Sequence, residues 1–269
     1  MNRLTLRTGL AVIMALLLSG ACGCKRTADQ SVFSGTAGIY SGSIAYYRFP
    51  GPVVSAPVRL LGAIGQEGVG YFIPVSPATG AVQVFRNLAG SGEITSFQYE
   101  VRPEGQRAAR GAQKWEIRIR RGGGSGNSRR LLGKFNRVDG YAALQLRELP
   151  RTDRYISFAS RGGVYRGIDL NRRTMASVTV HSDGKISGTN AEGCRISGSL
   201  TRVGGLDLFD VRMTLAGAPE CRTGITGVAF FDIRDRSGRF SGAGSYLYLI
   251  GASGDFSHGV AMVLRRRSQ

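Results

Sequence analysis

Histidine, cysteine and long apolar runs are all scarce in this chain of 269 residues. It contains two histidines and four cysteines, and no Cys-x-x-Cys pair, so we expect neither a metal site nor another cofactor. The apolar run at Gly9–Leu18 is about half as long as the ~20 residues that a membrane-spanning helix needs. Acidic residues are also few: the chain has 18 of them and 36 basic residues, of which only four are lysine. These absences disfavour metalloproteins and helical membrane proteins.

Motifs of known hydrolases are missing as well. The chain has no Gly-x-Ser-x-Gly and no His-Glu-x-x-His. Ser182-Asp-Gly-Lys185 matches the Ser-x-x-Lys motif of penicillin-binding-type enzymes. The catalytic serine of those enzymes begins a helix, whereas Asp-Gly predicts a tight hairpin here. Ser257-His258-Gly259 resembles the Ser-His-Gly-Cys of L,D-transpeptidases, but Val260 stands where the nucleophilic cysteine would be. We therefore expect a protein that is not an enzyme.

The N-terminus carries the most informative pattern. Arg3 and Arg7 precede the apolar run, which ends in Ser19-Gly-Ala-Cys22-Gly-Cys24. A charged start, about ten apolar residues and a small-residue end are typical of a secretory signal. Because the small residues end on cysteine, the segment resembles a bacterial lipoprotein signal, in which that cysteine is lipidated. Proximity to the apolar run favours Cys22, with Cys24 as the alternative; an ordinary signal peptide with incidental cysteines is the other interpretation.

This resemblance implies a signal peptide at residues 1–21 and a lipidated tether at residues 22–35. It also implies a protein attached through its lipid to the outer membrane, facing the periplasm or the cell surface. Cysteines in such an oxidising compartment usually pair. We therefore predict a disulfide between Cys194 and Cys221, with a metal site as the rival interpretation of the two thiols.

The rest of the chain has the pattern of antiparallel β-sheet. Short alternating apolar runs are broken by glycine, serine, asparagine and aspartate every eight to twelve residues. The C-terminal part predicts about eight strands, at residues 163–170, 175–181, 185–189, 194–202, 206–215, 225–233, 246–250 and 259–264. Eight short strands joined by hairpins can close into a small barrel without exposed edges. A sandwich uses the same alternation and stays open as the alternative.

Two pairs of motifs indicate that this pattern occurs twice. Gly38-Ile-Tyr-Ser-Gly42 matches Gly163-Val-Tyr-Arg-Gly167, and Gly140-Tyr-Ala-Ala-Leu144 matches Gly259-Val-Ala-Met-Val263. The two motifs are 102 residues apart in the first half and 96 in the second. The sequence therefore predicts an all-β chain of two tandem antiparallel β-barrels or barrel-like sandwiches. The first occupies residues 36–149 and the second residues 161–267, with a linker at residues 150–160.

Three features together support a family resemblance. The chain resembles an uncharacterised family of proteobacterial lipoproteins in its N-terminal cysteine, in its Gly-x-Tyr-x-Gly openings, and in the stretch Ser182-Asp-Gly-Lys-Ile-Ser-Gly188 that leads to Cys194-Arg-Ile-Ser-Gly-Ser199. That resemblance covers most of the chain after the signal and implies fold and location only. A lipid-anchored pair of β units is also similar, more loosely, to surface lipoproteins related to transferrin-binding protein B. Because a shared architecture does not transfer function, neither resemblance assigns a binding residue.

A basic segment is the strongest candidate for a binding site. Eleven arginines and lysines lie between Arg102 and Arg137, against two glutamates. Trp115, Ile117 and Ile119 alternate with charged residues, so one face of this strand is predicted to pack inward and the other to present arginines. A glycine-rich hairpin tip at residues 122–128 would bring two strands together. The candidate anion-binding residues are Arg118, Arg120, Arg121, Arg129 and Arg130.

Arginines arranged in this way repel one another, and a bound anion would relieve the repulsion. We therefore expect a non-catalytic binding or interaction module of the cell envelope, for an anion such as lipopolysaccharide, anionic lipid or a glycan. The simpler interpretation of the basic segment is an ordinary hydrated surface with small counterions. An inhibitor or immunity lipoprotein that blocks a secreted enzyme, and so has a protein partner, is the alternative function. Nucleic acid is not expected as a partner of an envelope protein.

Overall fold

The computed structural model describes ten ranges of the chain: residues 36–48, 56–90, 92–103, 112–121, 128–137, 140–149, 157–217, 221, 223–232 and 246–267. The predicted signal and tether, with Cys22 and Cys24, lie outside these residues, as does most of the predicted linker. Within the described ranges, no helix has the length and apolar character required to cross a membrane.

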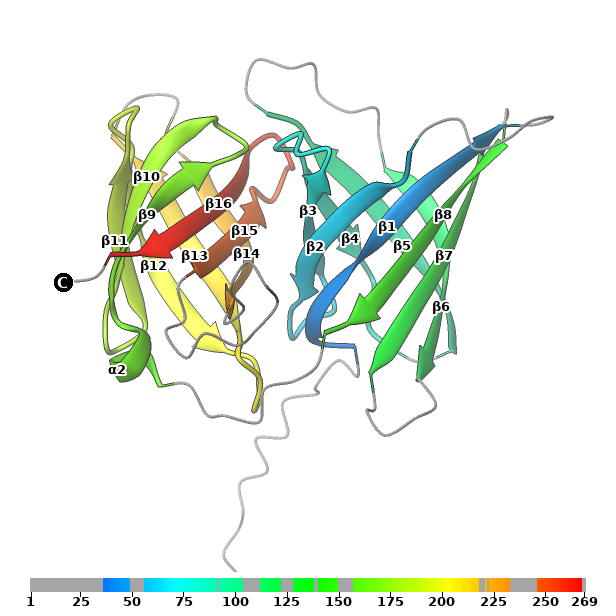
Figure 1. Ribbon diagram of the computed structural model, residues 1–269, viewed down its shortest axis with the longest axis horizontal. Coiled ribbons are helices and arrows are strands. Elements are labelled where there is room, and N and C mark those ends of the chain that lie inside the picture. Colours follow the sequence, from blue (N-terminus) through cyan, green and yellow to red (C-terminus); the bar gives the residue numbers. More distant parts are fainter. Residues whose placement is uncertain are drawn as a thin grey trace, which may run out of the picture. The chain divides into compact units, whose positions relative to one another are not determined.

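The described chain folds into two closed antiparallel β-barrels in tandem, each of eight strands (Figure 1). The first barrel consists of β1 (Gly38–Arg48), β2 (Val58–Ile64), β3 (Gly70–Ser76), β4 (Val82–Arg86), β5 (Gly92–Val101), β6 (Gln113–Arg121), β7 (Arg129–Arg137) and β8 (Gly140–Glu148). After the single turn of α2 (Phe158–Arg161), the second consists of β9 (Gly163–Asp169), β10 (Thr174–Val180), β11 (Lys185–Asn190), β12 (Arg195–Arg202), β13 (Leu208–Ala216), β14 (Thr223–Asp232), β15 (Tyr246–Ala252) and β16 (Gly259–Arg266). Each strand pairs with the next, and the first with the last. This confirms the predicted fold class and shows barrels rather than sandwiches.

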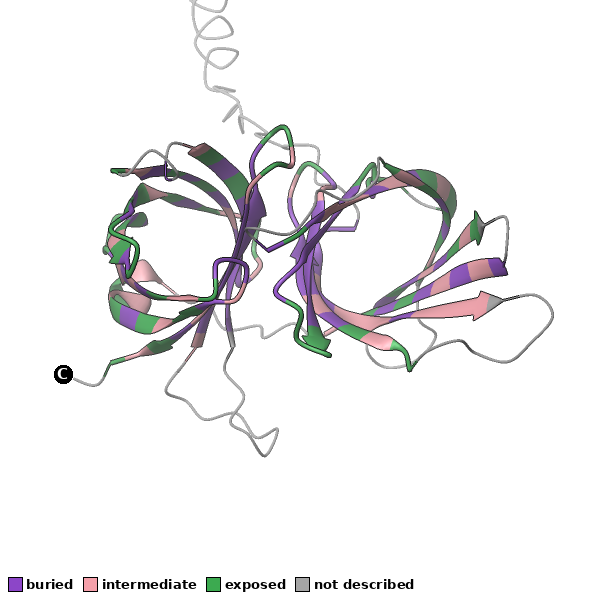
Figure 2. Ribbon diagram, turned by 90° about the horizontal axis from the view of Figure 1, so that it is seen from above, coloured by how far each residue is buried: buried purple, intermediate pink, exposed green. Residues whose placement is uncertain are grey.

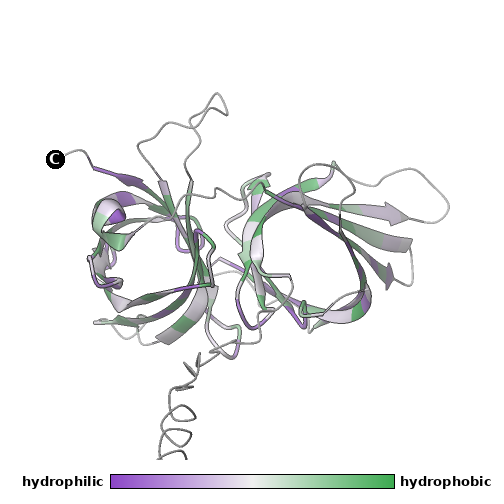
Figure 3. Ribbon diagram, turned by 90° about the horizontal axis from the view of Figure 1, so that it is seen from below, coloured by the Kyte–Doolittle hydropathy of each residue, from purple (hydrophilic) through white to green (hydrophobic). Residues whose placement is uncertain are grey.

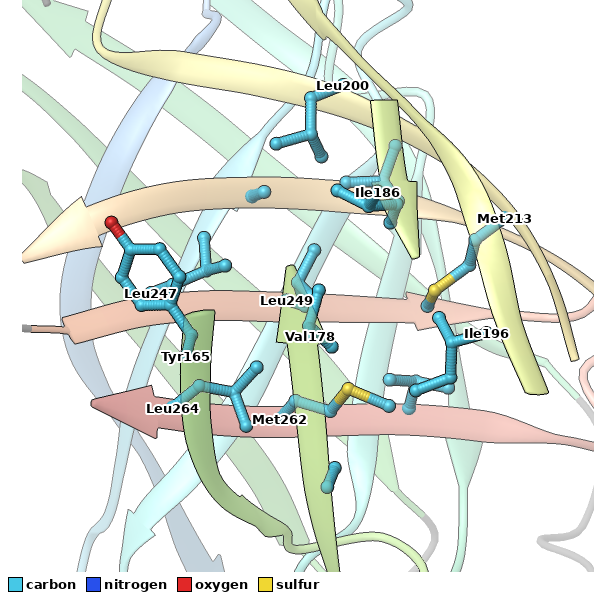
Figure 4. Packing of buried hydrophobic residues seen from close by; sticks show 14 of the residues in the cluster. Tyr165, Val178, Ile186, Ile196, Leu200, Met213, Leu247, Leu249, Met262 and Leu264 are labelled. Atoms are coloured by element: carbon cyan, nitrogen blue, oxygen red, sulfur yellow. The ribbon is translucent and has the colours of Figure 1, made fainter. Parts of the chain in front are cut away.

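Alternation along the strands separates a packed interior from an outer surface. On β12, for example, Ile196 and Leu200 are buried whereas Arg195 and Ser197 are exposed, and Figures 2 and 3 show the same mixture along other strands. Trp115, Tyr40 and Phe85 belong to the core of the first barrel. In the second barrel, apolar side chains from most of the strands meet inside (Figure 4). Each barrel therefore has its own core.

The Gly-x-Tyr-x-Gly repeat has the same structural role in both barrels. The hydroxyl of Tyr40 donates to the Thr36 carbonyl, and that of Tyr165 to the Arg161 carbonyl, each at 2.7 Å. The last glycine of each motif lies against the neighbouring strand: a Cβ at Gly42 would be 1.8 Å from the Gln145 carbonyl oxygen. A Cβ at Gly167 would likewise be 2.1 Å from a backbone oxygen. The motif therefore lets the first and last strands of each barrel pair closely. This structural role explains the repeat without any catalytic role for its residues.

A third apolar cluster joins the outer surfaces of the two barrels. It includes Ile73 and Val84 of the first barrel and Phe230, Ile250 and Ala261 of the second. Strands that contribute to it are buried on both faces: β4 is buried from Val82 to Phe85, and β16 from Gly259 to Met262. The sequence did not reveal this contact, because an apolar run without alternation fits any strand with two buried faces.

Cys194 and Cys221 form a disulfide with a Cα–Cα distance of 5.4 Å. Both cysteines are fully buried in the core of the second barrel. The bond joins the residue before β12 to the segment before β14.

Asp169 organises the first hairpin of the second barrel. Its Oδ1 accepts hydrogen bonds from the backbone N–H groups of Asn171 and Ala261 at 3.0 Å and of Arg172 at 3.5 Å. Asn171 in turn donates through Nδ2 to the Gly80 carbonyl of the first barrel at 3.0 Å. Asp169 is fully buried, and this burial raises the pKa of its carboxyl to about 6, although the three N–H groups and Arg172 act in the opposite direction.

This raised pKa predicts a specific pH dependence of stability. Asp169 is protonated in the folded chain at pH values where it is ionised in the unfolded chain, so its contribution is present below pH 4 and is lost as the pH rises through 6. Asp169→Asn keeps an acceptor at Oδ1 and cannot titrate. We expect the unfolding free energy of the wild type, relative to this variant, to fall by about 2 kcal/mol between pH 4 and pH 7 in urea titrations. A constant difference over that range would contradict the assignment.

Candidate anion-binding site

Three exposed arginines lie side by side on the outer surface of the first barrel. Arg120 on β6 is directly opposite Arg130 on β7, and Arg130 is directly opposite Arg147 on β8. All three side chains are exposed. Directly opposite residues share one face of a sheet, with Cβ atoms about 5 Å apart. We call Arg120, Arg130 and Arg147 the arginine row.

The charge of the arginine row is not compensated locally. Among the described residues, no carboxylate forms an ion pair with Arg120, Arg130 or Arg147, and neighbouring positions on the row repel each other. Planar guanidinium groups suit bidentate contact with phosphate, sulfate or carboxylate oxygens. The row is therefore chemically suited to an anion that has several oxygens.

Arg118, by contrast, has a local counterion. It lies opposite Glu93 of β5 and forms an exposed ion pair with that residue. Its charge is therefore partly compensated, although it lies on the same face as the row, two residues from Arg120. The side chain of Arg121 lies outside the described residues.

The prediction that Arg129 contributes to an exposed site is wrong. Its side chain is buried in the first barrel, where Nε and Nη2 donate to the two carboxylate oxygens of Glu148 at 3.0 and 3.3 Å. Its backbone N–H also donates to Glu148 Oε2 at 3.0 Å. Because successive residues of a strand point to opposite faces, Arg129 and Arg130 cannot both face outward. Arg129 is thus a structural cation with its own counterion.

Arg147 was missed because it is distant in sequence from the basic segment. The outward orientation of its side chain could nonetheless be predicted from the alternation along β8, where Leu144 and Leu146 are buried and Gln145 and Arg147 are exposed. What the sequence could not supply was the pairing of β7 with β8, which places Arg147 beside Arg130.

The same outer face carries an aromatic pair. Tyr47 of β1 is directly opposite Tyr141 of β8, and their rings stack with centroids 4.6 Å apart. Lys134 of β7 lies over the Tyr141 ring, with Nζ 5.0 Å from its centroid. Tyr141 and Arg147 are six residues apart on one strand, which corresponds to roughly 20 Å. Between them the outward positions of β8 are Ala143 and Gln145, so the face has arginines at one end and aromatic rings at the other.

A small pocket between the barrels is a second candidate. It has a volume of about 160 Å³ and is lined by residues of both signs, among them Glu67, Arg86, Asp210 and Arg212. Burial raises the pKa of Asp210, and Tyr71 in the same pocket contacts the Thr226 hydroxyl at 3.3 Å. Ligand pockets usually measure about 300–1,000 Å³, so this one has room for a few waters rather than a substrate.

A serine, a histidine and an aspartate meet in the turn between β15 and β16. The Ser257 hydroxyl is 2.7 Å from His258 Nδ1 and donates to Asp255, at 2.8 Å from both carboxylate oxygens. The hydroxyls of Ser253 and Ser257 hold the pKa of Asp255 at about 2. Since the single hydroxyl proton of Ser257 points to Asp255, His258 is not placed to remove it, and the group is a hydrogen-bonded turn. Among the described residues there is also no cluster of three metal-ligating side chains.

Comparison with known proteins adds little. No protein-family model and no curated protein matches the chain. A solved structure from Bacteroides fragilis, provisionally described as an outer membrane protein, aligns with 87% of this chain and 98% of its own. The sequence identity is 10% and the TM-score 0.27, which is too low a similarity to support a conclusion about fold or function.

Proposed function

We propose that this protein is a non-catalytic envelope lipoprotein that binds an anionic saccharide on the outer face of its first barrel. The observation that carries the proposal is the arginine row, three exposed guanidinium groups side by side without a described carboxylate partner. Phosphorylated sugars of lipopolysaccharide and sulfated or carboxylated glycans share the chemistry that such a row recognises. The predicted lipoprotein signal supports a location where these ligands occur.

Two features of the face favour a saccharide over a small inorganic anion. The half-buried Tyr47, whose ring stacks on Tyr141, adds apolar ring surface at the far end of the same face, against which the C–H groups of a sugar can pack. The distance of roughly 20 Å between the tyrosines and the arginine row suits an extended chain rather than a single ion. The ligand therefore combines anionic groups with a length of several sugar units.

The test is the binding of residues 33–269 to heparin and to lipopolysaccharide, compared with an Arg120→Ser/Arg130→Ser/Arg147→Ser variant. At roughly 1 kcal/mol for each exposed charge contact, we expect the variant to bind about a hundredfold more weakly. Isothermal titration at low and at physiological salt measures this loss.

A matched control removes the same charge elsewhere. Arg59, Arg195 and Arg212 are exposed and lie on β2, β12 and β13, where no register position places them opposite one another. Their replacement by serine should leave affinity within a few-fold of the wild type. Equal loss in both variants would reduce the proposal to a net-charge effect, and no binding by the wild type would refute it.

A further inference from the structure

β10, β9 and β16 are neighbouring strands of the second barrel (Figure 1). The residues on their outer face include both apolar and basic ones. Register places Met175, Ile168 and Val263 in one cross-strand row, and Ser177, Arg166 and Arg265 in the next. The row after that contains Thr179 and Val164. None of these outward positions carries a carboxylate. We call Val164, Arg166, Ile168, Met175 and Arg265 the amphipathic face.

Exposed apolar side chains concentrate here. Four large hydrophobic residues of the described chain are exposed, and three of them belong to this face: Met175 at 60%, Ile168 at 40% and Val164 at 37%. The fourth, Val75, is in the first barrel. Large apolar side chains that gather on one face of a domain often mark a surface that contacts another protein, a membrane or a ligand.

The charge of the face limits what can cover it. Arg166 and Arg265 are directly opposite each other and both exposed, so a second copy docked symmetrically would bring four guanidinium groups together without counterions. An anionic bilayer surface accepts both components: the apolar side chains enter the interface while long arginine side chains extend toward phosphate groups.

We infer that the amphipathic face docks on the surface of a bilayer that contains anionic phospholipid. The inference rests on the proposed lipid anchor only for proximity, since an anchored chain stays near such a surface. It is independent of the saccharide site, which lies on the other barrel. Docking would fix the orientation of the second barrel against the membrane.

Flotation with lipid vesicles tests this inference on the unlipidated residues 33–269, which form one compact unit. We expect binding to vesicles of phosphatidylcholine with phosphatidylglycerol, little binding to phosphatidylcholine alone, and weakening with salt. Arg166→Ser/Arg265→Ser should reduce partitioning on the order of tenfold. Ile168→Ser/Met175→Ser should produce a loss of similar order.

Two controls make the outcome specific. Val75→Ser removes the fourth exposed apolar side chain, and Arg59→Ser/Arg195→Ser removes two exposed charges outside the amphipathic face; both should float like the wild type. Thermal melts confirm that each variant is folded. Absence of vesicle binding, an equal loss of binding in Arg59→Ser/Arg195→Ser, or a wild-type dimer that Ile168→Ser/Met175→Ser dissociates would each overturn the inference. Failure of heparin binding would affect only the saccharide proposal.

Discussion

Replacing Glu148 with alanine is expected to destabilise the first barrel by about 3–5 kcal/mol. Glu148 is 2% exposed and accepts three hydrogen bonds from Arg129, whose guanidinium is itself buried. Without the carboxylate, a positive charge remains in the barrel wall with no counterion and little access to water. Glu148→Gln keeps part of the hydrogen bonding but not the charge, so we expect it to be intermediate.

The chain provides a built-in probe for this experiment. Its single tryptophan, Trp115, is fully buried in the core of the first barrel, so fluorescence during urea unfolding reports on that barrel. Arg129→Met combined with Glu148→Leu should recover most of the loss, because an apolar pair leaves no buried charge. A Glu148→Ala variant as stable as the wild type would show that Arg129 is not held by this carboxylate.

Removal of the disulfide is the second large effect. Cys194 and Cys221 are 27 residues apart, and closure of a loop of this size lowers the entropy of the unfolded chain by an amount equivalent to about 3–4 kcal/mol. Cys194→Ala/Cys221→Ala should therefore unfold at lower denaturant concentration, as followed by far-UV circular dichroism. Alanine avoids placing new hydroxyl groups in a fully buried site.

Reductant provides the control for that variant. It should shift the unfolding midpoint of the wild type toward that of the double variant and leave the double variant unchanged. If reductant has no effect on the wild type, or if the double variant is as stable as the oxidised protein, the bond does not stabilise the second barrel.

Local signals made the strand pattern of the second barrel predictable. Asp183-Gly184 marks the turn between β10 and β11, and the observed strand Lys185–Asn190 extends the expected one by a single residue. The inward orientation of Trp115 and Ile117 followed in the same way from alternation on β6. Alternation and turn chemistry act over a few residues, so they can be recognised without knowledge of the tertiary structure.

The site depended on information that these local signals lack. Arg147 belongs to it because β8 pairs with β7, and Arg129 leaves it because Glu148 neutralises it from inside the barrel. The partners of these two residues follow from register between strands, which sequence composition does not specify. Alternation along β7 alone, however, already prevents Arg129 and Arg130 from both facing outward. A count of basic residues thus identified the segment that contains most of the arginine row but could not separate the row from the buried ion pair.

The salt dependence of heparin affinity tests the central claim most directly. Each arginine that contacts the polyanion releases counterions, so log affinity falls linearly with log salt concentration. We predict that the slope for Arg120→Ser/Arg130→Ser/Arg147→Ser is shallower than the wild-type slope by about 2–3, by analogy with phosphate contacts in nucleic acids. The slope for Arg59→Ser/Arg195→Ser/Arg212→Ser should match the wild type. Identical slopes for the two variants would contradict a binding site at the arginine row.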